Sequence, residues 1–438
     1  MRSEFSKLLA NSGITLACQG VRLVLQLAST AILSRLLRPK DFGLIATVAI
    51  VTNFIGIFKD LGLTAATVQS KRVTQGQISA LFWINLAASL FLGLLVVGVS
   101  PLAALFFGEP KLQLIITVLA IPVVLSGAAS QHQALLQRDL RFGAIGASEI
   151  AAQAIAVLAA VAAAVCGWGC WALVLMYIVN AAALLVLVIL VSGWKPTWHL
   201  RRTGVRPMLR FGRDLTAFNI VNYFARNLDN LLIAKFVGET ALGFYNRAYQ
   251  LMLFPISQIN QPIAKVLLPG LARLRDEPEK YETTYLAFVR LIAWLTMPGI
   301  ALMIVIGDRV TVWLLGEQWY EAGRLFRVLA IAGLFQPLAS LNGGVMLSLG
   351  QAGRNLRGGI VASVLISISF VVGVFFGAYG VAVAYAIVMN LLYPFLFWYA
   401  HRMSPVRTVN YMRVIAAPVT VAVLICLLAG GVRWFITR

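Results

Sequence analysis

Long apolar runs separated by short polar or basic segments follow one another along the whole chain of 438 residues. A membrane-spanning helix needs about 20 largely apolar residues. Twelve segments meet this requirement: 11–34, 42–64, 77–99, 112–131, 146–166, 170–192, 213–236, 244–268, 286–307, 325–349, 357–376 and 379–400. A thirteenth apolar run covers 414–432. The pattern predicts an all-α polytopic membrane protein, because strands of a membrane barrel would alternate in polarity over about ten residues.

The composition excludes a sizeable soluble domain. Hydrophobic residues make up 60% of the chain and charged residues 12%, with a mean hydropathy of +0.86, whereas soluble domains carry about 25% charged residues. The net charge of +20 comes from basic residues in short connections rather than in one patch. We therefore expect the lipid bilayer as a partner and no nucleic acid.

The basic residues also predict the orientation of the chain. The connections on the side of the N-terminus hold 20 Lys and Arg residues, and those on the opposite side hold 10. Cytoplasmic loops carry the excess of Lys and Arg, so we expect the N-terminus and the connection 193–212 in the cytoplasm and 100–111 outside. The longest external connection is 307–324, which contains Asp308, Arg309, Glu317 and Glu321.

The chain contains a weak internal repeat. A shift of 200 residues sets 31–45 over 231–245, and further along Val-Leu-Ala-Ile at 118–121 meets the same tetrapeptide at 328–331. We interpret this as two six-helix lobes, 1–200 and 201–400, followed by an extra membrane segment, 401–438. Because six is even, both lobes enter from the same side, and we expect parallel repeats related by an axis along the membrane normal, around a central cavity.

Corresponding spans of the two repeats each contain a line of polar residues, which we call a polar stripe. On the first helix Gln19, Arg22, Gln26 and Thr30 share one face, and 200 residues later stand Asn219, Asn222, Arg226 and Asn230. Both arginines lie near the expected midplane. Further basic residues fall inside or at the end of spans: Lys59, Arg247, Lys265 and Arg290, with Lys265 expected on one face with Gln250, Ser257 and Gln261.

These charges have two interpretations. The residues stabilise helix packing, with Arg226 paired to Asp229 and Arg22 to Asp60, or they line a cationic cavity for an anionic substrate. The six basic residues outnumber the acids Asp60 and Asp229 in mid-span, with Glu149 nearer a helix end, which favours the cavity. Its candidate binding residues are Arg22, Arg226, Gln19, Gln26, Asn219, Asn222, Asn230, Lys265, Arg290 and Lys59, and the candidates for ion coupling are Asp229 and Asp60.

No pattern in the sequence points to catalysis or a cofactor. The chain lacks the Walker A, HExxH, CxxC and GxSxG patterns. Its three histidines, His132, His199 and His401, are far apart along the chain. We therefore expect no catalytic residue, no metal site, no cofactor and no enzymatic activity.

Three segments carry a further signal: LSRLLRPKDFGLIA (33–46), DLGLTAATVQ (60–69) and above all NLDNLLIAKFVGETALGFYNRAYQL (227–251). These segments resemble the Wzx-type polysaccharide flippases, and within them the colanic-acid exporter branch. This family belongs to the multidrug/oligosaccharidyl-lipid/polysaccharide exporter superfamily. The resemblance implies a bacterial inner-membrane protein with two six-helix bundles and alternating access. It also implies a polyprenyl-pyrophosphate-linked glycan as substrate, exported for exopolysaccharide or capsule biosynthesis, with the polysaccharide polymerase and export machinery as further partners. The family usually has an even helix count, whereas this chain has one apolar run beyond twelve.

Other function classes stay open at this point. A drug or cation antiporter of the same superfamily would have a cavity rich in carboxylates and aromatic residues, whereas the surplus here is basic. A membrane polysaccharide polymerase or ligase would need a long external loop with catalytic residues. A purely structural membrane scaffold would leave the two matched polar stripes without a purpose.

Overall fold

The protein is an all-α membrane protein, as the sequence predicts. The computed structural model describes residues 2–56, 74–139, 141–197 and 227–436. Within these ranges nine helices are long and apolar enough to cross a membrane, or ten if one bent pair counts as a single span. The contacts between Cα atoms divide the chain into two compact units, Met1–Asn227 and Leu228–Arg438. The lobe limits near residues 200 and 400 and the symmetry between lobes stay predictions.

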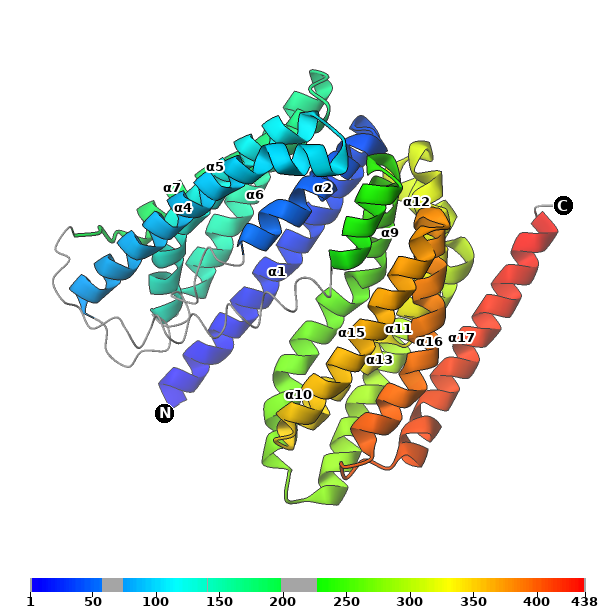
Figure 1. The fold of residues 1–438 in the computed structure, drawn as a ribbon. Helices are drawn as coiled ribbons and strands as arrows, with labels where there is room; N and C mark the ends of the chain where they lie inside the picture. Colours follow the sequence, from blue (N-terminus) through cyan, green and yellow to red (C-terminus); the bar gives the residue numbers. More distant parts are fainter. Residues whose placement is uncertain (1, 57–73, 140, 198–226, 437–438) are drawn as a thin grey trace. The chain divides into compact units, whose positions relative to one another are not determined.

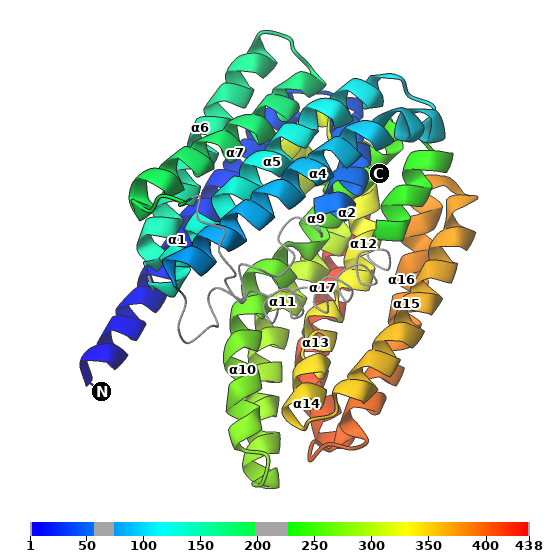
Figure 2. The ribbon, with the colours of Figure 1, turned by 60° about the vertical axis from the view of Figure 1, so that its left-hand side comes forward.

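Unit 1 is a bundle of long helices that lie side by side (Figures 1 and 2). Its described helices are α1 (Arg2–Leu36), α2 (Pro39–Gly56), α4 (Gln75–Phe107), α5 (Lys111–Arg138), α6 (Phe142–Val165) and α7 (Cys170–Ser192). Helix α4 packs on α5, α5 and α6 pack on α7, and α1 packs on α6. Each helix satisfies its own backbone hydrogen bonds, which a chain in lipid requires.

Three helix connections of unit 1 meet at the same end of the bundle. Lys40 at the start of α2 forms an ion pair of 3.4 Å with Glu109 between α4 and α5. The carboxylate of Asp41 lies 3.3 Å from the place that a Cβ atom would take at Gly169, in the connection before α7. The chain therefore returns to this end at every second span, as alternating spans require.

Unit 2 starts with a helix over 227–236 and continues through α9 (Glu239–Pro255), the π-helix η1 (Ile256–Asn260) and α10 (Gln261–Arg273). The remaining elements are α11 (Pro278–Leu315), the short η2 (Glu317–Trp319), α12 (Tyr320–Gly333), α13 (Gln336–Ala339), α14 (Asn342–Ser348), α15 (Ala352–Val374), α16 (Gly377–His401) and α17 (Thr408–Ile436). Its core lies between α9, α11, α12, α15 and α16.

The span expected over 325–349 is a bent pair of helices. The chain bends by 45° between the segments Glu317–Gly333 and Gln336–Ser348. Pro337 lacks an N–H group and cannot continue the hydrogen bonds of α12. Two side chains of α16 compensate for the break, because Asn390 Nδ2 donates to the carbonyl of Ile331 (3.3 Å) and Tyr393 OH to that of Ala332 (2.6 Å). Helix breaks at membrane depth are tolerated where neighbouring side chains satisfy the freed carbonyls.

The expected external loop 307–324 is wrong. Helix α11 continues to Leu315, and only Gly316 and one turn of 3₁₀ helix separate it from α12. Asp308, assigned to the loop from the sequence, is instead 3% exposed inside α11. Helices α11 and α12 approach closely there, since a Cβ atom on Gly323 would lie 2.6 Å from the Cα atom of Asp308. A polar residue at the end of an apolar run thus belongs to the helix because its neighbours bury it.

The π-helix η1 lies between Gln250 and Lys265, which the sequence places on one face. A π-helix takes up about one residue more per turn than an α-helix. Everything after Asn260 is therefore rotated by the angle of about one residue, about 100°, relative to α9. The shared face of Gln250, Ser257, Gln261 and Lys265 stays a prediction.

Helix α17 is a full-length span that runs parallel to α11. Its 29 residues reach about 43 Å. Asn410 bonds to Glu282, Cys426 Sγ lies 3.6 Å from the carbonyl oxygen of Ala301, and Arg433 bonds to Asp308. Along this interface the residue numbers of α17 and those of α11 increase in the same direction, so the two helices end on the same side of the membrane.

Candidate substrate-binding site

Gln19, Arg22 and Gln26 share one face of α1, because α1 is a continuous helix over Arg2–Leu36. Gln19, Arg22 and Gln26 are all exposed, while Ser29 and Leu33 further along α1 are buried. The side chain of Arg22 is 48% exposed, which leaves room for a second partner. The stripe therefore offers amide and guanidinium donors outside the core of unit 1.

Arg22 has a carboxylate partner that the sequence did not identify. Its Nη1 atom donates to Glu149 Oε2 on α6, and the Glu149 side chain is 28% exposed. Helices α1 and α6 are close at this level, since a Cβ atom on Gly146 would lie 2.7 Å from Cys18 Sγ. The prediction from the sequence assigned Glu149 to a helix end and so overstated the surplus of positive charge in unit 1.

Several predicted site residues lie outside the described residues. They are Asn219, Asn222, Arg226, Lys59 and Asp60. For Lys265 the described part is its backbone in α10. The pairings Arg22–Asp60 and Arg226–Asp229 and the second polar stripe therefore stay predictions.

Asp229 and Asn230 lie next to an aromatic cluster in unit 2. Asp229 is 1% exposed, and its Oδ2 atom accepts a hydrogen bond of 2.9 Å from Tyr245 OH. The ring of Tyr245 stacks on Tyr249 at 5.9 Å, and Tyr249 meets the edge of Tyr385 at 6.3 Å. The Oδ1 atom of Asn230 is buried and has no hydrogen-bond partner among the described residues. Asp229 is thus a buried acid that a hydroxyl group holds in place.

Two basic residues within the spans of unit 2 are accessible. Arg290 of α11 is exposed, next to the buried Val289. Arg247 of α9 is half-buried and donates to Gln250 Oε1 at 2.9 Å. Arg247 therefore belongs to a polar network on its own helix.

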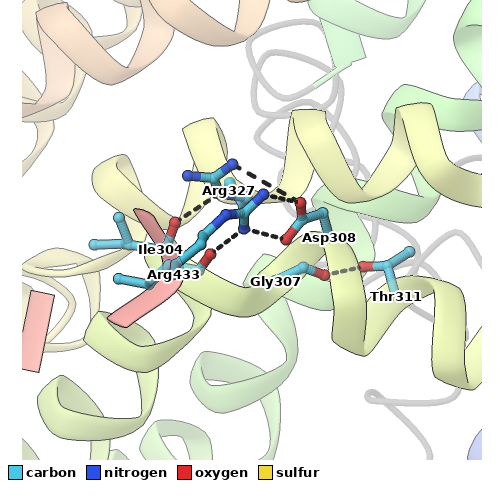
Figure 3. Close-up of polar contacts among 7 residues, drawn as sticks. Ile304, Gly307, Asp308, Thr311, Arg327 and Arg433 are labelled. Atoms are coloured by element: carbon cyan, nitrogen blue, oxygen red, sulfur yellow. Dashed lines mark hydrogen bonds and ion pairs between the residues drawn. The ribbon is translucent and has the colours of Figure 1, made fainter. Parts of the chain in front are cut away.

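Asp308 is a buried acid of unit 2 that the sequence analysis placed in a loop. Asp308 accepts two hydrogen bonds from Arg433 of α17, of 2.7 Å at Oδ1 and 2.5 Å at Oδ2 (Figure 3). Arg327 of α12 lies 3.9 Å from the same carboxylate and donates to the carbonyl of Ile304. No local pattern could find this cluster, because Asp308 and Arg433 are 125 residues apart.

Comparisons with known proteins agree with this architecture. The model of a family described as "Polysaccharide biosynthesis protein" matches residues 32–324. The lipopolysaccharide biosynthesis protein WzxC of Escherichia coli (strain K12) is 26% identical over 371 residues, which are 83% of this chain and 75% of WzxC. The teichuronic acid biosynthesis protein TuaB of Bacillus subtilis (strain 168) is 27% identical over 75% of this chain and 68% of TuaB. The succinoglycan biosynthesis transport protein ExoT of Rhizobium meliloti (strain 1021) is 24% identical over 72% of this chain and 64% of ExoT.

Solved structures share the fold over nearly the whole chain. The lipid II flippase MurJ in an inward closed conformation superposes with a TM-score of 0.74 at 10% identity, covering 98% of this chain and all of MurJ. An inward-facing multidrug resistance transporter of the MATE family, from the MOP superfamily, superposes with a TM-score of 0.62 at 13% identity, covering 91% of this chain and 94% of the transporter. The fold is therefore common to proteins whose cargo differs.

Proposed function

Because the chain belongs to the polysaccharide biosynthesis protein family, we propose that it flips a lipid-linked oligosaccharide across the membrane. The cargo is a polyprenyl-pyrophosphate-linked repeat unit that moves from the cytoplasmic to the periplasmic leaflet for exopolysaccharide or capsule biosynthesis. The observation that carries this proposal is the family match over residues 32–324. The fold alone does not distinguish a lipid-linked sugar from a drug as the cargo, since MurJ and MATE transporters share this fold.

The same match decides against the drug or cation antiporter. The relatives are named for lipopolysaccharide, teichuronic acid and succinoglycan biosynthesis, and ExoT is named as a transport protein. None of these names describes a glycan polymerase or ligase, and we assign no catalytic step to this chain. The protein is a multi-pass membrane protein. We place it in the bacterial inner membrane with a cytoplasmic N-terminus, where the polymerase and export machinery would receive its product.

A lipid-linked sugar can cross if its tail stays in the bilayer while its polar head passes through a hydrated cavity. Alternating access opens such a cavity first to the cytoplasm and then to the periplasm. The membrane potential is negative inside, so it pushes negative charges outward. Moving the two charges of a pyrophosphate outward is favoured by roughly 2.3 kcal/mol per charge per 100 mV. The membrane potential therefore favours export of a pyrophosphate.

We assign the pyrophosphate to Arg22 and Arg226, because two guanidinium groups can each form paired hydrogen bonds with phosphate oxygens. The amides Gln19, Gln26, Asn219, Asn222 and Asn230 would bind sugar hydroxyls, and Lys59, Lys265 and Arg290 would add positive charge. The ion pair between Arg22 and Glu149 adds a requirement to this assignment. Arg22 must leave Glu149, or be shared with it, when the phosphate arrives.

A second assignment concerns ion coupling by Asp229 and Asp60. Asp229 is buried, and its hydrogen bonds in the described residues come from Tyr245 OH and the backbone N–H of Asn230. A buried carboxylate held by neutral donors can exchange a proton or a sodium ion at a modest cost, compared with one held by an arginine. We propose Asp229 as the coupling residue on this ground.

The test of the pyrophosphate site is export by the double variant Arg22→Gln and Arg226→Gln. Each replacement removes charge-assisted bonds of roughly 1.5–3 kcal/mol but keeps a polar side chain. We expect export to stop in a strain that lacks its own flippase, at a normal protein level in the membrane. Lysine at either position should rescue only partly, since it cannot form the paired bonds.

The control for Arg22 is the variant Glu149→Gln. If Arg22 served only to hold α1 on α6, Glu149→Gln and Arg22→Gln would lower stability equally, and both would leave export per folded molecule unchanged. Wild-type export from the double variant would rule out the pyrophosphate site.

A further inference from the structure

Two spans of unit 2 are interrupted, and their interruptions lie next to each other. One span consists of α9, η1 and α10, and the other of α12, α13 and α14. Helix α9 packs on α12, and α10 packs on α14. The side chain of Asn260, the last residue of η1, contacts the carbonyl of Pro337 in α13. Each span is therefore divided into two halves at the same level of the unit.

Asn260 joins the two interruptions by hydrogen bonds. Its Nδ2 atom donates to the carbonyl of Pro337 at 2.5 Å and to Ser340 Oγ at 2.6 Å, and Ser340 Oγ donates to the same carbonyl at 2.7 Å. A carbonyl can only accept, which fixes the orientation of the Asn260 amide. In a regular helix this carbonyl would accept from the N–H of Leu341, but that N–H bonds to Leu338 at 3.1 Å. Asn260, which is 2% exposed, therefore supplies a donor where the break removed one.

The halves on either side of the interruptions are packed differently. Helix α12 packs extensively on α11 and α16 as well as on α9. This packing is close, since a Cβ atom on Gly333 would lie 3.0 Å from Met252 Cγ. Helices α10 and α14 pack on each other more than on any other described helix. Segments with few packing contacts open more readily than segments in a core, so α10 and α14 are the halves best suited to move.

Both interruptions have the backbone chemistry of hinges. Pro255 ends α9, Pro262 lies in the first turn of α10, and Pro337 lies in the first turn of α13. Proline lacks the N–H group that a continuous helix needs, and π-helical turns and proline are common causes of sharp bends. Hinge motions concentrate in a few residues at the ends of elements. Two independent hinges would let α10 and α14 move separately, so their motion is shared only if a contact joins the hinges.

We propose that Asn260 is a positioning residue for export, which joins the two hinges so that α10 and α14 swing as one body relative to α9 and α12. This assignment rests on the proposed flippase function, since alternating access requires parts of the protein to move while the lipid-linked sugar crosses. Asn260 binds no substrate in this role. It keeps two half-spans in step, because both hydrogens of its amide are bonded to the other span.

The first test compares Asn260→Leu with the matched control Tyr393→Phe. Tyr393 is also buried, and its hydroxyl group also satisfies a carbonyl freed by the break after α12, but it connects that break to α16 and not to η1. Both variants should lower the midpoint of thermal unfolding by similar amounts, because each loses buried hydrogen bonding. Asn260→Leu alone should slow export of the lipid-linked repeat unit, by about tenfold per protein molecule. Export is measured as periplasmic delivery in a strain that lacks its own flippase.

Two further measurements distinguish positioning from substrate binding and from loss of fold. The affinity of Asn260→Leu in lipid nanodiscs for the repeat unit that accumulates when the gene for this chain is removed from its host should stay within about twofold of wild type. Ser340→Ala keeps the bond between Asn260 and Pro337 and disturbs the fold least. It should slow export less than Asn260→Leu and more than Tyr393→Phe.

The second test follows the movement itself by double electron–electron resonance between nitroxide labels in nanodiscs. Exposed label sites are Leu268 on α10, Leu347 on α14 and Leu391 on α16, in a chain whose four natural cysteines are replaced by alanine. Addition of the lipid-linked repeat unit should change the distance between labels at Leu347 and Leu391. The distance between labels at Leu268 and Leu347 should stay constant, and its distribution should broaden in Asn260→Leu.

The outcomes separate the two proposals. If Asn260→Leu and Tyr393→Phe change export equally, or if neither changes it, Asn260 only satisfies a carbonyl and the positioning role fails, while the flippase function stands. The role also fails if the Leu268–Leu347 distance changes as much as the Leu347–Leu391 distance, or if neither distance changes. If the wild-type protein delivers no repeat unit, the proposed function fails and the role of Asn260 in export fails with it.

Discussion

The contact between Arg433 and Asp308 predicts how firmly α17 is held. Arg433 gives the carboxylate two hydrogen bonds, of 2.7 and 2.5 Å, and its Nη1 atom also donates to the carbonyl of Val305 at 2.5 Å. The Asp308 side chain is 4% exposed and that of Arg433 is 23% exposed. Arg433→Met removes the charge but keeps an apolar side chain of similar length. It leaves a buried carboxylate whose remaining basic neighbour among the described residues, Arg327, lies 3.9 Å away.

The magnitude follows from these contacts. Each charge-assisted bond contributes roughly 1.5–3 kcal/mol, and removing one partner of a buried ion pair costs about 3–5 kcal/mol. Arg327 and the partial exposure of Arg433 reduce the loss, so we expect about 3 kcal/mol. At 1.4 kcal/mol per factor of ten, the population with α17 detached should rise about a hundredfold.

Cys426 provides the assay, because its Sγ atom lies 3.6 Å from the carbonyl oxygen of Ala301 in the interface between α17 and α11. After the other three cysteines are replaced by alanine, the rate at which a lipophilic maleimide labels Cys426 reports detachment of α17. Arg433→Met should raise this rate about a hundredfold. Arg433→Lys keeps the charge and should give an intermediate rate.

The matched control is Arg324→Met. Arg324 is exposed and pairs with Glu321 three residues away on the same helix. Exposed pairs of this kind contribute little to stability, so labelling of Cys426 should not change. Labelling at the wild-type rate in Arg433→Met would show that apolar packing alone holds α17, and the reasoning above would be wrong.

Two further predictions concern coupling and topology. If Asp229 couples export to an ion, Asp229→Asn should still fold but lose the stimulation of transport by an imposed proton or sodium gradient in proteoliposomes, and full retention of that stimulation would contradict the assignment. A single cysteine at Glu109, between α4 and α5, should react with a membrane-impermeant reagent in intact cells, because that connection is expected outside; labelling only after lysis would reverse the orientation.

The sequence determined the positions of most helices. Among the residues that the structure describes, nine of the thirteen apolar runs correspond to helices long and apolar enough to cross the membrane. This succeeds because the requirement is local: in lipid each backbone N–H and C=O group must be satisfied within its own segment. The polar face of α1 was equally readable, since residues three and seven positions apart share a helical face whatever surrounds them.

The tertiary structure decided which side chains meet. Glu149 is 127 residues from Arg22, and Asp308 is 125 residues from Arg433, so no spacing in the sequence relates them. The bend after α12 likewise depends on Tyr393, a residue of a different helix, which satisfies a carbonyl freed by the break. Apolarity and helical period are properties of one segment. Partners of buried charges and broken helices depend on how segments pack, and only the folded molecule contains that information.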